Sequence, residues 1–176
     1  MWLISLLVII ILITIFSLIM LAVSKSVSEQ YEVSSMAYYN CDIKKLWGLV
    51  TDFPNQAIWR TGIIKVEKIS DISGRNIWKE FNSNGQVMKI ETSEYSPMRR
   101  LVRRLINENE DGEIIWIYDF AEVGEVSTLT VSEQGKLLNP ILKLISKFNS
   151  SKTKVLNMYF QDIANELKVS LKIWKI

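Results

Sequence analysis

The chain has 176 residues, with 21 Lys and Arg against 19 Asp and Glu, and its formal net charge is +2. This charge is too mild to indicate nucleic-acid binding, which usually requires Lys and Arg concentrated on one face. The sequence has no histidine and a single cysteine, Cys41. Histidine-dependent nucleophiles, histidine-ligated metals, thiolate metal clusters and an intramolecular disulfide are therefore excluded. We expect no nucleic acid, no metal and no cofactor.

The N-terminal segment is a long apolar run, because residues 1–24 contain no charged residue, no Pro and no Gly. In a helix, the stretch from Trp2 to Val23 spans about 33 Å, slightly more than the roughly 30 Å hydrocarbon core of a bilayer. We predict one transmembrane helix over 1–24 and a linker over 25–31. A cleaved signal peptide is the alternative, since Ala22-Val23-Ser24 supplies small residues, but no Lys or Arg precedes the run.

Lys25, Lys44 and Lys45 follow the apolar run, and no Lys or Arg precedes it. This bias predicts that the domain after the anchor faces the cytoplasm. The unpaired Cys41 agrees with a reducing compartment. We therefore expect a single-pass membrane protein whose partners include membrane lipids.

Residues 31–137 show the alternation and turn signals of antiparallel strands. Asn40-Cys41-Asp42 predicts the cap of a short helix ending near Thr51, and a further helical turn is expected over 55–59. The seven predicted strands cover 31–39, 63–69, 76–81, 86–95, 101–107, 113–122 and 126–134. Turns are expected between successive strands, for example at Val123-Gly124-Glu125.

The C-terminal part has helical periodicity. Asn139-Pro140 predicts a helix start, Asn149-Ser150 an interruption, and 152–167 a long helix. The apolar stripe of this helix comprises Val155, Leu156, Tyr159, Phe160, Ile163 and Leu167. Two stretches are typical of basic amphipathic surface helices or of ordinary packed ones, namely 136–148 with Lys136, Lys143 and Lys147, and the tail 169–176 next to Lys168 with Lys172 and Lys175.

The segment from Asp42 to Asn55, followed by Trp59, resembles the opening of the polyketide cyclase/dehydrase group of the START-like SRPBCC superfamily. Residues 130–135, Asn139-Pro140 and the helix carrying Tyr159 are similar to that group's last strand, turn and closing helix. The resemblance covers about 31–168, and we place the domain at 32–168. It implies an α+β helix-grip fold, in which a seven-stranded antiparallel sheet curves around the long C-terminal helix. It also implies a hydrophobic cavity between them.

A cavity under the long helix would be lined by alternate strand residues. Met88 and Ile90 are expected to face inward because Lys89 and Glu91 occupy the other face. Aromatic residues with a polar atom favour a ligand site, although a solid core is the alternative. The predicted lining comprises Trp59, Trp78, Met88, Ile90, Arg104, Trp116, Tyr118, Tyr159 and Ile163.

Arg103 and Arg104 are adjacent in one predicted strand, so they point to opposite faces. The inward one could hold an acidic head group or pair with a carboxylate. We place Arg104 in the lining, although the sequence does not fix the register. The candidate acid–base carboxylates are Asp52, Asp119, Glu91 and Glu94. No spacing singles out a catalytic pair, and we assign no catalytic residue.

The leading hypothesis is a membrane-anchored START-like domain that binds a hydrophobic small molecule or lipid in this cavity. One alternative is a polyketide cyclase or dehydratase-type enzyme that uses a carboxylate or a tyrosine. Another is a non-catalytic structural or regulatory interaction module. Fold alone does not decide among them.

Overall fold

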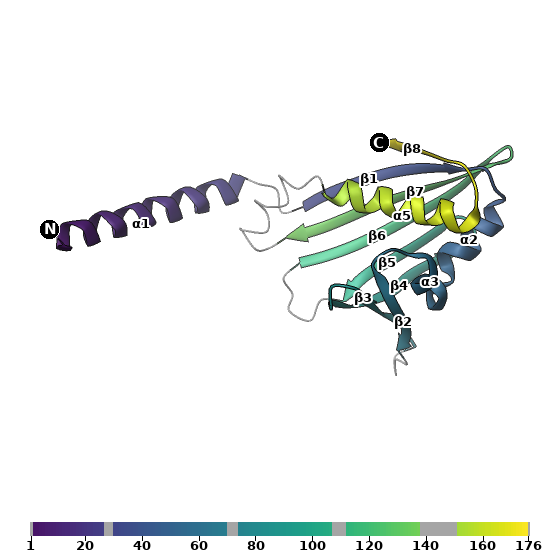
Figure 1. The fold of residues 1–176 in the computed structure, drawn as a ribbon, viewed down its shortest axis with the longest axis horizontal. Coiled ribbons are helices and arrows are strands. Elements are labelled where there is room, and N and C mark those ends of the chain that lie inside the picture. Colours follow the sequence, from purple (N-terminus) through teal and green to yellow (C-terminus); the bar gives the residue numbers. More distant parts are fainter. Residues whose placement is uncertain (1, 27–29, 70–73, 107–111, 138–150, 176) are drawn as a thin grey trace.

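The computed structural model describes residues 2–26, 30–69, 74–106, 112–137 and 151–175. It shows an N-terminal helix, α1, followed by one α+β domain (Figure 1). The domain elements are β1 (Gln30–Tyr39), α2 (Ile43–Thr51), η1 (Phe53–Asn55), α3 (Gln56–Trp59), β2 (Ile63–Ile69), β3 (Asn76–Asn82), β4 (Val87–Ser96), β5 (Arg100–Ile106), β6 (Gly112–Val123), β7 (Val126–Leu137), α5 (Ser151–Leu167) and β8 (Leu171–Lys175).

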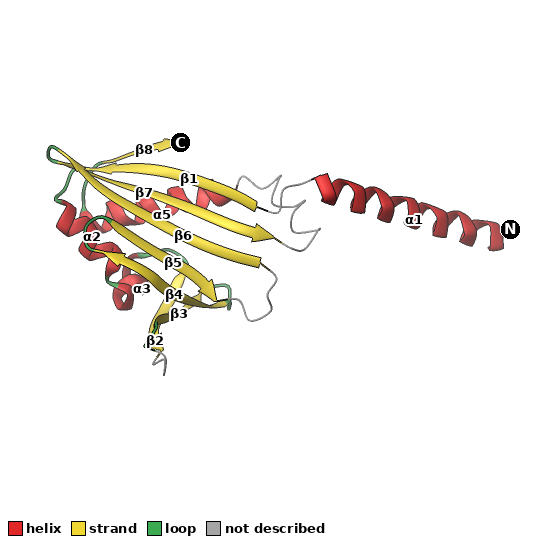
Figure 2. Cartoon of the chain, turned by 180° about the vertical axis from the view of Figure 1, so that it is seen from behind, coloured by secondary structure: helices red, strands yellow, loops and turns green. Residues whose placement is uncertain are grey.

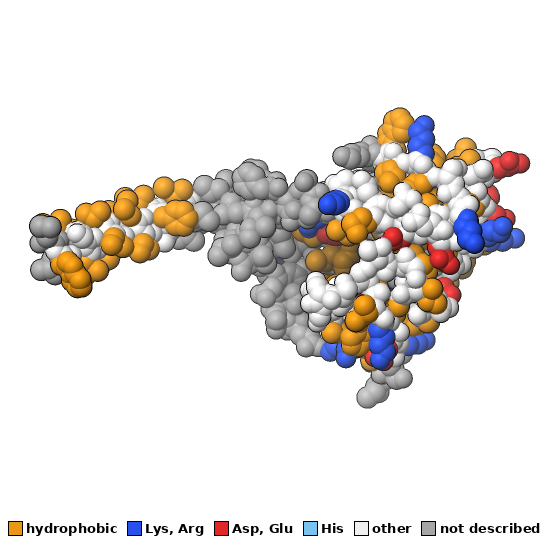
Figure 3. All heavy atoms as spheres, viewed as in Figure 1, with side chains coloured by type: hydrophobic (Ala, Val, Ile, Leu, Met, Phe, Trp, Pro, Cys, Tyr) orange, Lys and Arg blue, Asp and Glu red, His pale blue; other side chains and the backbone are white. Residues whose placement is uncertain are grey.

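Helix α1 (Trp2–Ser26) is 25 residues long and extends away from the domain (Figures 1 and 2). The large apolar side chains of α1 that the structure describes are exposed, from 48% at Val8 to 94% at Trp2, and they are spread along the helix (Figure 3). Among the residues that the structure describes, no helix is long and apolar enough to cross a membrane.

Eight strands form one antiparallel sheet in the order β2-β3-β4-β5-β6-β7-β1-β8. Consecutive strands from β2 to β7 are neighbours, as the predicted meander requires. The β6–β7 connection has two residues, Gly124-Glu125, between the paired Val123 and Val126. Gly124 has φ +63°, which a glycine adopts without the steric cost that a side chain would add.

Helices α2, α3 and α5 lie on the same face of the sheet (Figures 1 and 2). Asp42 caps α2 by accepting a hydrogen bond of 2.6 Å from the backbone N–H of Lys44. The core joins α2, α5 and the inner face of β1, β5, β6 and β7. Phe160 and Ile163 of α5 are completely buried there, so α5 is held by the packing of its apolar stripe.

The C-terminal tail differs from the sequence-based expectation. Residues Leu171–Lys175 form an eighth strand, β8, which pairs with β1. The lysine spacing predicted a helix, but Leu171 and Ile173 also alternate with Ser170 and Lys172, and pairing with β1 selects the strand. The count of seven strands and the amphipathic tail helix are therefore wrong. Val155 was placed in the buried stripe of α5 but is 61% exposed. The predictions for 138–150 lie outside the described residues.

Candidate functional site: two polar clusters inside the grip

The sheet register shows which side chains share the inner face, because residues directly opposite on antiparallel strands point the same way. Trp78 lies opposite Ile90, and Leu101 lies opposite Tyr118. Tyr118, Leu101 and Ile90 are buried. Met88 is on the same face, opposite Glu80. The inward orientation predicted for the β4 residues is therefore confirmed.

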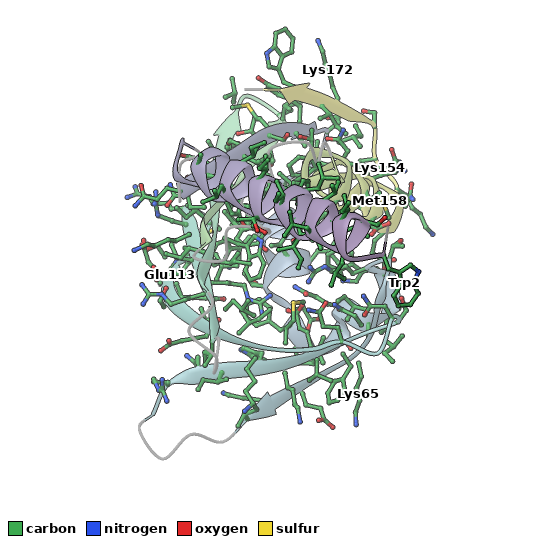
Figure 4. The ribbon with its side chains drawn as sticks, turned by 90° about the vertical axis from the view of Figure 1, so that its left-hand side faces the viewer. Trp2, Lys65, Glu113, Lys154, Met158 and Lys172 are labelled. Atoms are coloured by element: carbon green, nitrogen blue, oxygen red, sulfur yellow. The ribbon has the colours of Figure 1, made fainter. Side chains whose placement is uncertain are left out.

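The structure brings together eight of the nine predicted lining residues on the side of the sheet that carries the helices. Tyr159 and Ile163 of α5 are buried, and the Trp59 ring lies 5.9 Å from the Tyr159 ring. Trp116 packs against the core from β6. The exception is Arg104, whose side chain is half-exposed on the outer face and lies 3.4 Å from Glu113. Figure 4 shows Glu113 on the opposite side of the domain from Lys154 and Met158 of α5.

Arg103 is the inward arginine of β5, which corrects the assignment to Arg104. Its Nη1 donates to Glu80 Oε1 at 2.7 Å, and Arg60 Nη1 donates to Glu80 Oε2 at 3.0 Å. The side chains of Glu80 and Arg103 are 0% and 3% exposed. We call Arg60, Glu80 and Arg103 the arginine cluster. It contains two positive charges and one negative charge.

Short local contacts hold the arginine cluster in place. Arg60 follows α3, and its Nη1 also donates to Gln56 Oε1 at 3.1 Å. Gln56 in turn donates to the Val50 carbonyl at the end of α2. The guanidinium of Arg103 lies 4.4 Å from the centre of the Phe53 ring, and that of Arg60 lies 5.3 Å from the Tyr159 ring. These contacts fix both guanidinium groups against aromatic rings.

The electrostatics of the arginine cluster keep Glu80 ionised. Burial raises the pKa of the Glu80 carboxyl, but the charges of Arg103 and Arg60 outweigh burial and hold that pKa below its usual value. Burial also raises the pKa of the Tyr118 and Tyr159 hydroxyls above the ordinary tyrosine value. Near neutral pH, the two phenols are therefore protonated hydrogen-bond donors, and Glu80 is no proton donor.

Several buried polar atoms around the arginine cluster have no hydrogen-bond partner among the described residues. They include Nε and Nη2 of Arg103, Oγ1 of Thr92 and Nε1 of Trp59. Thr92 lies directly opposite Arg103 on the neighbouring strand. Buried donors are normally paired, and an unpaired one costs about 1–3 kcal/mol, more when it is charged.

A second polar group surrounds Glu133 of β7. Its carboxylate accepts from Tyr31 Oη at 2.9 Å, Trp116 Nε1 at 3.0 Å and Lys152 Nζ at 3.1 Å. We call these four residues the Glu133 cluster. It has one positive and one negative charge. Gly135 makes room for it, because a Cβ there would overlap the Tyr31 ring.

The four carboxylates proposed from sequence do not form this site. Asp119 and Glu94 contact the partly exposed Arg100, and Asp52 accepts from Asn55 at an exposed position. Glu91 lies opposite Arg104, on the outer face. The carboxylates that do join the two clusters are the buried Glu80 and the partly buried Glu133, and sequence reasoning missed both.

A recess of about 500 Å³ lies where β1, β6 and β7 meet, and Tyr31, Glu113 and Gln134 contribute to its walls. None of the nine predicted lining residues belongs to it. The binding space that those nine residues would enclose therefore stays a prediction. No group of His, Cys, Asp or Glu suited to a metal ion occurs in the described part of the chain.

No protein-family model matches the sequence. No curated protein matches it either. Solved structures do match the fold. The Zhui aromatase/cyclase from Streptomyces sp. R1128 superposes with a TM-score of 0.62 at 11% identity, covering 79% of this chain and 94% of that one. A START superfamily protein from Mycobacterium smegmatis superposes with a TM-score of 0.57 at 15% identity, covering 77% and 98%.

The di-domain aromatase/cyclase BexL, from the BE-7585A biosynthetic pathway, is also similar, with a TM-score of 0.58 at 12% identity. The match covers 74% of this chain, which spans 49% of the length of BexL. Identities this low establish the architecture alone. The domain therefore has the α+β helix-grip fold of START-like proteins, with an eight-stranded sheet.

Proposed function

We propose that the domain binds a hydrophobic small molecule in its interior, between the sheet and α5. The observation that carries this proposal is the set of buried, unpartnered donors among aromatic side chains. Trp59 Nε1 and two nitrogens of Arg103 lack partners among the described residues, and the rings of Trp59, Phe53 and Tyr159 lie close by. A mostly apolar ligand with a few polar atoms would pack against these rings and accept hydrogen bonds from these donors.

The fold supports the same proposal. Two of its structural neighbours are named as aromatase/cyclases and one as a START superfamily protein. The apolar ligand between sheet and helix is what the sequence resemblance to the START-like superfamily implies, and the shared fold is in keeping with it. The conversion that a cyclase would catalyse is a separate question, because fold and reaction are not coupled.

We further propose that α1 attaches the domain to a membrane, with the domain on the cytoplasmic side. The support is the sequence, because residues 1–24 carry no charge and Lys25 follows directly. The run includes Leu3, Met20 and Leu21, whose side chains lie outside the described set. Attachment would keep the domain close to a reservoir of apolar molecules.

Photolabelling tests the binding proposal on the full chain in lipid nanodiscs. An uncharged apolar diazirine probe should label peptides from β5, β6 and α5. An excess of the same compound without the diazirine should abolish that labelling by competition. The exposed apolar surface of α1 supplies an internal comparison, because labelling there should not saturate. Saturable labelling of the β5, β6 and α5 peptides supports the proposal, whereas labelling confined to α1 contradicts it.

A matched pair of variants sharpens the test. Ile163→Trp adds bulk at a buried position of α5, and Val155→Trp adds it at an exposed position of the same helix. Ile163→Trp should reduce interior labelling strongly, while Val155→Trp should leave it unchanged. Far-ultraviolet circular dichroism of both variants checks that each is folded.

Membrane attachment has its own test. Alkaline carbonate should leave the full chain in the membrane pellet. The double substitution Ile10→Lys and Ile11→Lys should release it to the supernatant, because each lysine at a helix centre costs about 2.5–3.5 kcal/mol on insertion scales. Release of the unsubstituted chain by carbonate would contradict the anchor.

A further inference from the structure

We infer that the interior ligand carries a carboxylate, which binds the free edge of the Arg103 guanidinium. This inference rests on the proposed function and adds the chemical class of the ligand. Its evidence is the hydrogen-bond geometry of one side chain and the charge balance around it.

The two unpartnered nitrogens of Arg103 belong to the same edge of the guanidinium. Nη1 is engaged by Glu80 at 2.7 Å, which leaves Nε and Nη2 without a partner among the described residues. In the planar guanidinium, the N–H of Nε and one N–H of Nη2 point in parallel. Two parallel N–H groups match the two oxygens of a carboxylate.

The surroundings hold this edge in a fixed orientation. One face of the guanidinium lies 4.4 Å from the centre of the Phe53 ring, and Glu80 holds its far side. Thr92, directly opposite on β4, has a buried hydroxyl that also lacks a partner among the described residues. An anion at the edge of Arg103 would therefore bind in a place where the arginine side chain is only 3% exposed.

The charge balance indicates one negative charge on the ligand. Arg60, Glu80 and Arg103 together carry one surplus positive charge. Glu133 and Lys152 balance each other, so they do not supply the missing negative charge. A monoanion would neutralise the surplus, whereas a phosphate monoester would overshoot it. A planar, singly charged carboxylate matches both the two parallel N–H groups of Arg103 and the single surplus positive charge.

The experiment compares two probes that differ only in this group, 1-naphthaleneacetic acid and 1-naphthaleneacetamide. Each competes with the uncharged diazirine probe for labelling of the β5, β6 and α5 peptides in full-length chain in nanodiscs. Empty nanodiscs correct for partition into lipid. We expect the acid to compete at a concentration about 10- to 100-fold lower than the amide, the range for a charge-assisted pair.

Variants of adjacent arginines identify the group responsible. Arg103→Met should remove the preference for the acid. Arg103→Lys should keep only part of it, because a lysine lacks the two parallel N–H groups of the guanidinium. Arg104→Met is the matched control on the outer face and should keep the full preference. The comparison of the two probes on the unsubstituted chain does not depend on whether Arg103→Met folds.

The outcomes separate the two proposals. Equal competition by acid and amide, or competition by neither while the interior is labelled, overturns the carboxylate inference and leaves the binding function standing. An acid preference that survives in folded Arg103→Met also overturns the inference. If the diazirine probe labels no interior peptide in a saturable way, the proposed function itself fails.

Discussion

The two polar clusters between the sheet and its helices contain similar groups but differ in their balance of charges and hydrogen bonds. In the Glu133 cluster, one carboxylate accepts three hydrogen bonds and faces one lysine, so its charges cancel. In the arginine cluster, one carboxylate faces two arginines, and two nitrogens of Arg103 lack partners among the described residues. A neutral cluster in which every donor has a partner needs only a structural role to explain it. A charged cluster with unpaired donors indicates a missing partner.

The clusters also differ in what joins them to the fold. The Glu133 cluster links β1, β6 and β7 to the start of α5 through Lys152. The arginine cluster links α3 to β3 and β5, and Arg60 also lies against Tyr159 of α5. Removing groups from each cluster in turn tests whether one is structural and the other is built for a ligand.

The largest effect is expected for Glu80→Gln, which leaves two arginines near each other without a carboxylate. Breaking a buried ion pair in this way costs about 3–5 kcal/mol. The free energy of unfolding, measured by urea titration of the full chain in detergent micelles, should fall by that amount. Glu94→Gln, at an exposed ion pair with Arg100, should cost less than about 1 kcal/mol. Equal costs for the two variants would contradict the buried network.

Acid should remove the same interaction in the unsubstituted chain. The pKa of Glu80 is lower in the folded chain than the ordinary glutamate value of about 4.3. Its contribution to stability is therefore fully present above that ordinary value and is lost as the pH falls through the lower, folded value. Urea titrations between pH 7 and pH 3 should show this loss, and Glu80→Gln should have a flatter profile. Parallel profiles would count against an ionised Glu80.

Glu133→Gln should have a smaller effect, because the amide oxygen still accepts from Tyr31 or Trp116 while the charge opposite Lys152 is lost. We expect a cost of about 1.5–3 kcal/mol in the same titration, the worth of hydrogen bonds to a charged group. Binding of the acid probe should be unchanged. Glu113→Gln, at a half-exposed position, is the control. Loss of acid binding in Glu133→Gln would remove the distinction between the clusters.

Gly135→Ala should give the smallest loss, because its Cβ would push Tyr31 away from Glu133. We expect about 1–2 kcal/mol, within the range for overpacking. Gly48→Ala is the matched control in α2, where a Cβ has open space, and it should stabilise the chain by about 0.5–1 kcal/mol. If Tyr31→Ala does not relieve the cost of Gly135→Ala, the overlap with Tyr31 is not its cause.

Most of the fold could be predicted because alternation, turn residues and helix caps agree along the domain. Strands β1 to β7 begin and end within a few residues of the predicted bounds. The eighth strand was missed since Leu171–Lys175 has both helical lysine spacing and strand alternation. Its pairing with β1 is a long-range contact that no local pattern reveals.

The site was harder to predict, for reasons that differ among its residues. Arg103 and Arg104 each share a face of β5 with apolar residues, so the sequence does not identify the inward arginine. Glu80 shares its face with Trp78, while Ile77 and Phe81 mark the other face as equally apolar. Glu133 could have been found, because it lies on the same face of its strand as Leu129 and Val131, which are buried. The pairing between distant elements comes only from the structure.

The central claim is that the free edge of Arg103 binds a carboxylate, and its Nε–H reports this directly. We would record the ¹⁵N–¹H signal of the Arg103 side chain in the full chain in detergent micelles, assigned by its loss in Arg103→Lys. Adding 1-naphthaleneacetic acid should move this signal downfield, and the matching amide should not, while the Arg104 signal stays in place. A signal that does not move with the acid, or that moves equally with acid and amide, would contradict the account.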